Sequence, residues 1–164
     1  MLVQVRPGER TGMKILAVKR ELCTGCGECE RVCAQTFFKV DDRGKSAIRV
    51  DEAPGGGYHV AFCDQCGECI AVCPTEALAR SKNGIVRLHA SACVGCLACV
   101  GFCPTLVMYL VPDKAVPVKC IACGKCVPAC PTGALYMLDV EVPPPVTELT
   151  RSVRMKEGAP THGG

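Results

Sequence analysis

The cysteines of this chain form four short runs whose spacing is suited to metal chemistry. Each run has the form C-x2-C-x2-C-x3-C, and the runs begin at Cys23, Cys63, Cys93 and Cys120. This spacing is typical of [4Fe–4S] ligation, in which three thiolates of a run bind one cluster and the fourth binds a neighbouring cluster. The sequence therefore predicts four [4Fe–4S] clusters whose ligands are all sixteen cysteines: Cys23, Cys26, Cys29, Cys33, Cys63, Cys66, Cys69, Cys73, Cys93, Cys96, Cys99, Cys103, Cys120, Cys123, Cys126 and Cys130.

The runs form an internal repeat with a few departures. Ala34 follows the last cysteine of the first run, where the other three runs have proline. Leu97 stands in the third run at a position that is glycine in the others. A glycine there lets the backbone approach a cluster and its amides donate to sulfur. We expect these differences to give the four clusters different reduction potentials.

Short strands are predicted around the runs. Residues 78–80 and 85–88 flank Asn83-Gly84 and predict a β-hairpin. Further strands are expected at 15–18, at 47–50 and at 133–138. The segment 63–103 thus looks like a complete two-cluster ferredoxin. The expected fold class is α+β, with short strands and short helices around the clusters, organised as two nested bacterial-ferredoxin-like modules.

Three regions are expected along the chain. Residues 1–14 form a polar leader, and residues 15–138 form the cluster-binding domain. Within that domain, the central module 63–103 is nested inside 15–62 and 104–138. Residues 139–164 form a tail with three consecutive prolines, which favour an extended polyproline segment. A disordered end and an arm that docks on a partner are both open for this tail.

Composition points to metal rather than to a conventional core. The chain of 164 residues has 16 cysteines, no tryptophan and only 4% aromatic residues. Metal-binding free energy can replace core packing, so we expect the apoprotein not to fold. A disulfide scaffold is disfavoured because no secretory signal is visible, and a cytoplasmic protein is expected. A structural zinc site is the other alternative. It is disfavoured because a zinc ion needs only four ligands, whereas this chain repeats one four-cysteine run four times.

Charge and hydropathy exclude two classes of partner. The formal net charge of +3 counts the cysteines as neutral, and four clusters with their thiolates would bring it to roughly −5. Basic residues are scattered rather than gathered in a stripe, so no nucleic acid is expected. No apolar run has the length of a membrane span.

From residue 15 to residue 138 the sequence resembles the four-cluster, ferredoxin-like subunits of multisubunit oxidoreductases. The resemblance rests on CTGCGECERVC, on SAIRV in the long first spacer and on VPVKCIACGKCVPACPTGAL. Catalytic partners in that family include formate dehydrogenases, dimethyl sulfoxide reductase-type enzymes, hydrogenases, carbon monoxide dehydrogenase and tungsten aldehyde oxidoreductases. All four runs here are compact, which is more like the subunits of tungsten aldehyde oxidoreductases or carbon monoxide dehydrogenases.

The resemblance also implies a nested set of ligands. In the family the second run pairs with the third and the first with the fourth. The implied clusters have the ligands Cys63, Cys66, Cys69 and Cys103; Cys93, Cys96, Cys99 and Cys73; Cys23, Cys26, Cys29 and Cys130; and Cys120, Cys123, Cys126 and Cys33. Tandem pairing of first with second and third with fourth satisfies the same exchange rule and stays open.

No catalytic residues are identified. The sixteen cysteines are used as ligands, and His59, His89 and His162 lie far apart in the sequence without a catalytic or ligand motif. The hypothesis is therefore a non-catalytic subunit that relays single electrons between a tungsten-, molybdenum- or nickel-containing catalytic subunit and a second redox partner, in a hetero-oligomer. The alternatives are a free soluble polyferredoxin acting as a diffusible carrier, and a zinc-binding structural module.

Overall fold

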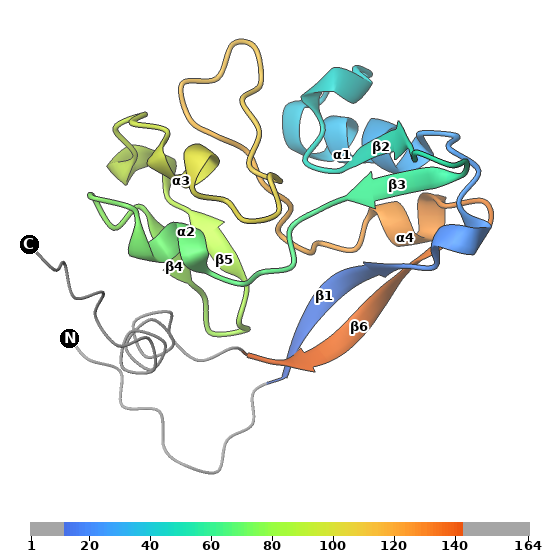
Figure 1. Cartoon of the computed structure of the whole chain (residues 1–164). Helices are drawn as coiled ribbons and strands as arrows, with labels where there is room; N and C mark the ends of the chain where they lie inside the picture. Colours follow the sequence, from blue (N-terminus) through green and yellow to red (C-terminus); the bar gives the residue numbers. More distant parts are fainter. Residues whose placement is uncertain (1–11, 143–164) are drawn as a thin grey trace, which may run out of the picture.

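The structure is a computed structural model that describes residues 12–142, and it consists of short elements (Figure 1). Its three sheets have two antiparallel strands each. The helices are α1 (Glu28–Phe38), α2 (Glu68–Ala71), α3 (Ala98–Gly101) and α4 (Cys126–Ala129). Short 3-10 turns add η1 (Arg20–Leu22), η2 (Arg43–Lys45) and η3 (Ala90–Ala92). Short strands with short helices agree with the predicted α+β class.

The first and last strands pair with each other and bring the two ends of the described chain together. β1 (Gly12–Val18) runs antiparallel to β6 (Leu135–Glu141), from Gly12 opposite Glu141 to Val18 opposite Leu135. Leu16 and Leu135 are buried, which anchors this ribbon to the core. Each strand is longer than predicted at the end that faces away from the cysteines, because the backbone pairing continues past Ile15 and Leu138.

The middle of the chain contains the predicted hairpin. β4 (Leu78–Arg80) pairs with β5 (Val86–Leu88), and the turn between them contains Asn83-Gly84. Gly84 has φ +81°, and a Cβ there would lie 2.6 Å from the Cβ of Met13 on β1. Leu78 and Val86 are buried beneath α2 and α3 in the middle module. Glycine at this turn therefore allows the hairpin to approach the terminal ribbon.

The long first spacer forms a second hairpin, β2 (Arg49–Glu52) with β3 (Tyr58–Ala61). A strand was predicted at 47–50, two residues earlier. The Ile48 amide donates to Ser46 Oγ at 3.1 Å, so local hydrogen bonding occupies this amide and the ladder begins at Arg49. Three glycines with positive φ, Gly55, Gly56 and Gly57, turn the chain between the strands, as expected for a plain surface turn.

Helix α1 is the longest helix of residues 12–142, and its length follows from Ala34. Its eleven residues run past Cys33, whereas α2, α3 and α4 have four residues each. Proline follows the last cysteine in the other three runs and disfavours helical backbone in the residue before it. Ala34 is fully buried and imposes no such limit, so α1 continues to Phe38.

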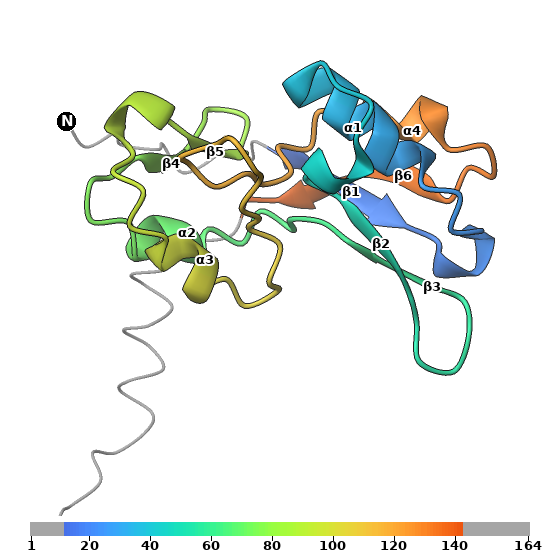
Figure 2. The same cartoon turned by 90° about the horizontal axis from the view of Figure 1, so that it is seen from above.

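Two hydrophobic cores form around the cysteines. One contains Cys63, Cys69, Cys99 and Cys103, together with Leu78 and Val86. The other contains Cys29 and Cys126, together with Leu16, Ile48 and Leu135. Cys120 packs against both cores. In Figures 1 and 2 the elements of the two inner runs lie on one side of the molecule and those of the first and last runs on the other. Within residues 12–142 no helix is long and apolar enough to cross a membrane.

Candidate metal centres

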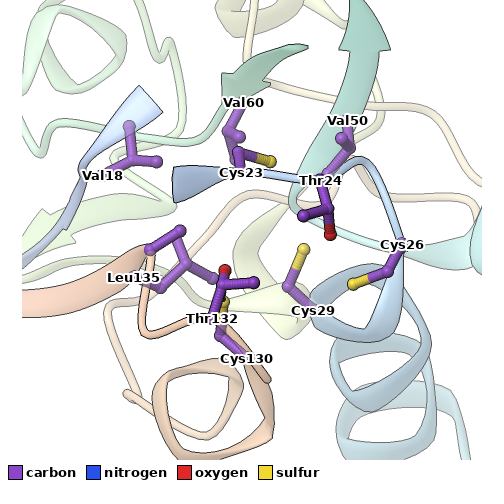
Figure 3. A pocket seen from close by; sticks show the side chains of 12 residues that line it. Val18, Cys23, Thr24, Cys26, Cys29, Val50, Val60, Cys130, Thr132 and Leu135 are labelled. Carbon is purple, nitrogen blue, oxygen red and sulfur yellow. Dashed lines mark hydrogen bonds between the residues drawn. The ribbon is translucent and has the colours of Figure 1, made fainter. Parts of the chain in front are cut away.

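The first and last runs meet at a hollow that is lined by four cysteines. Cys23, Cys26 and Cys29 come from the first run and Cys130 from the last. Figure 3 shows the sulfurs of Cys23, Cys26 and Cys29 pointing into the same space, with Cys130 on the opposite wall. The rest of the lining is mainly apolar, from Val18, Val50, Val60, Ala134 and Leu135. The first run thus contributes three thiols to this site, and the last run, about a hundred residues later in the sequence, contributes the fourth.

A second hollow repeats this arrangement with the roles of the two runs exchanged. Cys120, Cys123 and Cys126 come from the last run and Cys33 from α1. Leu16, Phe37 and Ile48 contribute apolar walls. The Cys126 thiol lies within electrostatic range of Cys120, Cys123 and Cys33, and also of Cys29 of the first hollow. The two hollows are therefore neighbours in the outer core.

The eight cysteines of the two middle runs gather around the inner core. Cys63, Cys69, Cys99 and Cys103 are buried there, and Cys73 packs against them. The Cys99 thiol interacts electrostatically with Cys93, Cys96 and Cys73. The Cys69 thiol interacts with Cys63 and Cys66, and also with Cys99. Cysteines of the second run therefore lie close to cysteines of the third run, and cysteines of the first run lie close to those of the fourth.

A backbone amide donates to one cysteine sulfur in each of the four runs. The donors are Gln65 to Cys63, Ala122 to Cys120, Ala47 to Cys33 and Val107 to Cys103, each at 3.4 Å. Gln65 and Ala122 have positive φ, as have the glycines at the same place in the other runs, Gly25 and Gly95. Hydrogen bonds of this kind to ligand sulfurs stabilise thiolates and tune the potential of an attached cluster.

The last cysteine of each run has a distinct neighbour. In three runs a threonine hydroxyl two residues later lies near the sulfur, at 3.8 Å for Cys73, 3.7 Å for Cys103 and 3.6 Å for Cys130. In the first run the helix continues, and Thr36 donates to the Val32 carbonyl at 2.7 Å instead. Cys33 accepts from the Ala47 amide in its place. Two residues after its last cysteine the first run has Gln35, where the other runs have threonine, so Cys33 lacks the threonine contact of the other three.

Burial favours the neutral form of several of these thiols. Burial raises the pKa of Cys29, Cys69 and Cys126 to about 12, and burial raises the pKa of Cys120 to about 11. Cys130 differs: burial raises its pKa, but Thr132 and the backbone amides that follow lower it more. Because the thiolate is the metal ligand, metal binding must supply the free energy that deprotonates these buried thiols.

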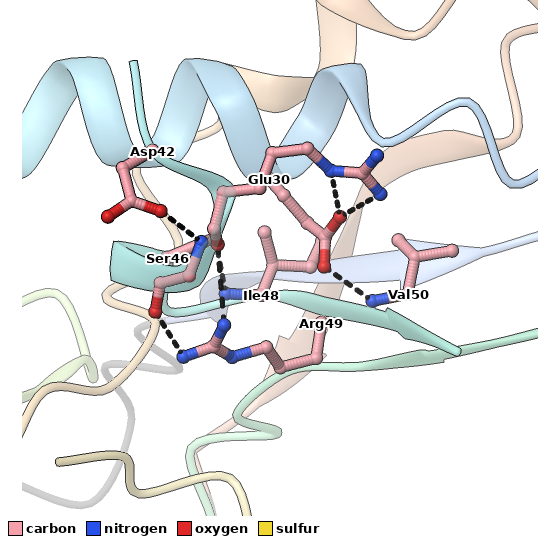
Figure 4. Close-up of polar contacts among 8 residues, drawn as sticks. Glu30, Asp42, Ser46, Ile48, Arg49 and Val50 are labelled. Atoms are coloured by element: carbon pink, nitrogen blue, oxygen red, sulfur yellow. Dashed lines mark hydrogen bonds and ion pairs between the residues drawn. The ribbon is translucent and has the colours of Figure 1, made fainter. Parts of the chain in front are cut away.

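A buried carboxylate lies next to the first site, and the sequence pattern did not single it out. Glu30 follows the candidate ligand Cys29, and its Oε1 accepts from the Val50 amide at 3.0 Å. Its Oε2 accepts from Arg43 Nε at 2.8 Å and from the Nη2 of the same guanidinium. Arg49 adds hydrogen bonds to the carbonyls of Arg43 and Gly44 (Figure 4). These contacts attach α1 to η2 and β2, and so fix the wall of the first hollow.

The donor set fits an iron–sulfur cluster better than a single ion. Each outer hollow has four thiols around an apolar space, and a [4Fe–4S] cluster requires four thiolates. No three histidine, cysteine or acidic side chains of residues 12–142 converge in a way that would hold one metal ion. All sixteen cysteines are free thiols, and eight of them line these two hollows.

Comparison with known families agrees with this reading. The family model described as "4Fe-4S dicluster domain" matches residues 22–77, 62–107 and 119–158, which together make up more than half of the chain. A second model with the same description matches residues 85–131. The matched segments include all four cysteine runs. Several [4Fe–4S] clusters are thus a property of this chain.

Two curated proteins are similar over about a third of the chain. An uncharacterized ferredoxin of Methanocaldococcus jannaschii is 34% identical over 65 residues, which are 38% of this chain and 73% of the ferredoxin. The beta subunit of the NADH-dependent phenylglyoxylate dehydrogenase of Aromatoleum evansii is 38% identical over 61 residues. That match spans 34% of this chain but only 14% of the dehydrogenase subunit.

The solved structures to which this chain is similar include chains of one enzyme complex. A chain of the active site complex BamBC of benzoyl-coenzyme A reductase with 1,5-dienoyl-CoA covers 90% of this chain and 93% of its own length. Its sequence identity is 22% and its TM-score 0.48. The complex as isolated gives 22% identity and a TM-score of 0.45.

Proposed function

Because this chain belongs to the 4Fe-4S dicluster domain family, we propose that it is an electron-transfer subunit whose four clusters relay single electrons between a catalytic oxidoreductase subunit and a second redox partner. When bound, the clusters supply reversible one-electron chemistry. The chain itself supplies sixteen thiolate ligands, amide donors to their sulfurs and two apolar cores that exclude water. The observation that carries the proposal is the placement of every cysteine run beside a partner run in one small domain.

The proposed ligand sets are nested. Cys23, Cys26 and Cys29 share a cluster with Cys130, and Cys120, Cys123 and Cys126 share one with Cys33. The two hollows with these linings support this pairing over the tandem one. For the middle runs, the inner core supports Cys63, Cys66 and Cys69 with Cys103, and Cys93, Cys96 and Cys99 with Cys73.

The same pairing supports the proposed domain organisation. In this proposal the module 63–103 is inserted in the sequence between 15–62 and 104–138, and the pairing of β1 with β6 supports it by joining the two outer segments. The leader 1–14 and the tail 139–164 lie largely outside the described residues, and we propose the tail as a docking arm. A cytoplasmic location is proposed because thiolate ligands need a reducing compartment.

The partner is proposed to be a tungsten-, molybdenum- or nickel-containing catalytic subunit in a hetero-oligomer. Similarity to a subunit of the phenylglyoxylate dehydrogenase supports a place in a multisubunit oxidoreductase. The match to the uncharacterized ferredoxin spans 73% of that protein's length, and this supports the second candidate, a free polyferredoxin that diffuses between partners.

An anaerobic pull-down of the native protein separates these candidates. Its eluate is analysed for iron, zinc, tungsten, molybdenum and nickel, and the co-purifying chains are identified. A stoichiometric large subunit that carries tungsten, molybdenum or nickel is the result expected for the relay subunit. Iron-loaded protein that elutes alone from gel filtration, at every salt concentration tested, would contradict the subunit proposal and leave the free carrier.

A further inference from the structure

Lys119 is a buried lysine at the junction of the two cores. Only 4% of the residue is exposed, and it immediately precedes the candidate ligand Cys120. The ion pairs found among residues 12–142 do not include it. Lysine is rarely buried without a carboxylate partner, because an ammonium loses its hydration there. A buried lysine of this kind therefore requires an explanation.

The ammonium group is held by three neutral oxygens. Lys119 Nζ donates to the Val86 carbonyl at 2.8 Å, to the Cys120 carbonyl at 3.0 Å and to Gln65 Oε1 at 3.0 Å. An ammonium has three N–H donors, so each of them has an acceptor. Neutral dipoles solvate the charge without cancelling it. The positive field of Lys119 therefore persists in a region of low dielectric constant.

Gln65 links this charge to two cysteine groups. Its side chain is fully buried, and its Nε2 donates to the Cys120 carbonyl at 2.8 Å and to the Cys63 carbonyl at 3.4 Å. Its backbone amide donates to Cys63 Sγ at 3.4 Å. Cys63 opens the second run and Cys120 the fourth. The Lys119 charge thus lies between the second and the fourth cysteine runs, and it is fixed there by a residue of the second run.

Two of its three acceptors place the Lys119 ammonium beside the second run in particular: Gln65 belongs to that run, and Val86 lies in the inner core with Cys63 and Cys69. Burial raises the pKa of the Cys63 and Cys69 thiols, and Lys119 opposes that rise more than any other charged group does. At Cys120 its effect ranks lower. Near Cys29 the buried group is the Glu30 carboxylate, which adds to the rise that burial causes in the pKa of that thiol. Unlike Lys119, Glu30 is paired with a side chain of opposite charge, that of Arg43.

We propose that Lys119 sets the reduction potential of the cluster held by Cys63, Cys66 and Cys69, and makes that cluster the first of the four to accept an electron. This inference rests on the proposed function. One electron enters from a one-electron donor and leaves to a one-electron acceptor, with no bond formed and no proton moved. Lys119 stabilises the added negative charge, so electrons reside preferentially at the junction between the inner and outer modules.

The test compares the midpoint potentials of four lysine variants with those of the wild-type protein. Lys119→Met and Lys119→Gln remove the buried charge, and Lys119→Arg retains it. Lys125→Met is the matched control, because Lys125 lies beside Cys126 but is exposed to solvent. Each iron-loaded protein is titrated with dithionite through redox mediators, and reduction is followed by electron paramagnetic resonance.

In Lys119→Met and Lys119→Gln, the equilibrium constant for the first reduction should fall at least tenfold. This fall lowers the highest midpoint potential by at least 59 mV for a one-electron step. Lys119→Arg and Lys125→Met should change this equilibrium constant by less than threefold, because the charge is kept in the first and screened by water in the second. Unchanged midpoints in Lys119→Met or Lys119→Gln with full iron content would overturn the inference.

A measurement on the wild-type protein covers the case in which the neutral variants do not load iron. The protein is reduced by one electron, and the hyperfine-shifted β-protons of its cysteines are assigned by nuclear magnetic resonance. The signals of Cys63, Cys66 and Cys69 should change first, and first changes at Cys23, Cys26 and Cys29 would overturn the inference. A wild-type protein that contains no iron contradicts the proposed function instead.

Discussion

Replacing Glu30 with glutamine should loosen the attachment of α1 to β2 and speed the loss of clusters. The carboxylate is buried and accepts from the Val50 amide and from two nitrogens of Arg43. A glutamine side chain has one acceptor oxygen and a donor group, so it satisfies either the Val50 amide or Arg43 but not both. One hydrogen-bond donor then faces another donor in a site that excludes water.

The magnitude follows from the burial of each partner. A buried donor without an acceptor costs about 1–3 kcal/mol. The side chain of Arg43 is 51% exposed, so water compensates for much of its lost ion pair. The expected loss is therefore about 2 kcal/mol, which corresponds to a rise of up to about 30-fold in the unfolding rate.

The assay follows bleaching of the brown chromophore in guanidinium chloride under anaerobic conditions. Glu28→Gln is the matched control, because it makes the same chemical change on the same helix at a side chain that is 40% exposed and pairs with Arg31. That control should cost about 0.3–0.5 kcal/mol, or less than threefold in rate. Equal bleaching rates for Glu30→Gln and Glu28→Gln would refute the role assigned to the buried carboxylate.

Two further changes test what holds the fold together. Chelation of the iron should abolish the far-ultraviolet circular dichroism of the native fold, since both cores contain candidate cluster ligands and metal binding supplies folding free energy; an apoprotein that keeps its native spectrum would contradict this. Ala34→Pro should cost about 3 kcal/mol by breaking α1 after Cys33, whereas Ala34→Gly should cost about 1 kcal/mol. Similar chromophore half-lives for the two Ala34 variants in guanidinium chloride would show that the length of α1 is unimportant.

Local patterns made much of the architecture predictable. Three ligands of one cluster come from a single short loop, so the number of residues between them is fixed. The sixteen candidate cysteines could therefore be identified directly from the sequence. Asn83-Gly84 fixes a tight turn, and the hairpin was accordingly predicted at β4 and β5. Strand ends were less predictable: the β1–β6 pairing depends on two segments that are more than a hundred residues apart, and it continues three residues beyond the expected limits.

The features that sequence reasoning missed depend on distant partners. The departure at Ala34 was noticed, but its consequence, the eleven-residue helix α1, was not predicted. Lys119 and Glu30 resemble surface residues in the sequence. Their burial follows from contacts with Gln65, Val86, Val50 and Arg43, which no local pattern reveals. The nested pairing was available from a family resemblance, whereas the spacing of the runs left tandem pairing equally open.

The most direct test of the central claim is the metal content of the protein purified without exposure to air. Iron and acid-labile sulfide are measured per chain, and zinc is measured in the same samples. Four cubane clusters predict about sixteen iron atoms and about sixteen sulfides, in a brown protein. About eight iron atoms would mean that only one pair of runs is loaded, and a colourless protein that contains zinc instead of iron would contradict the account.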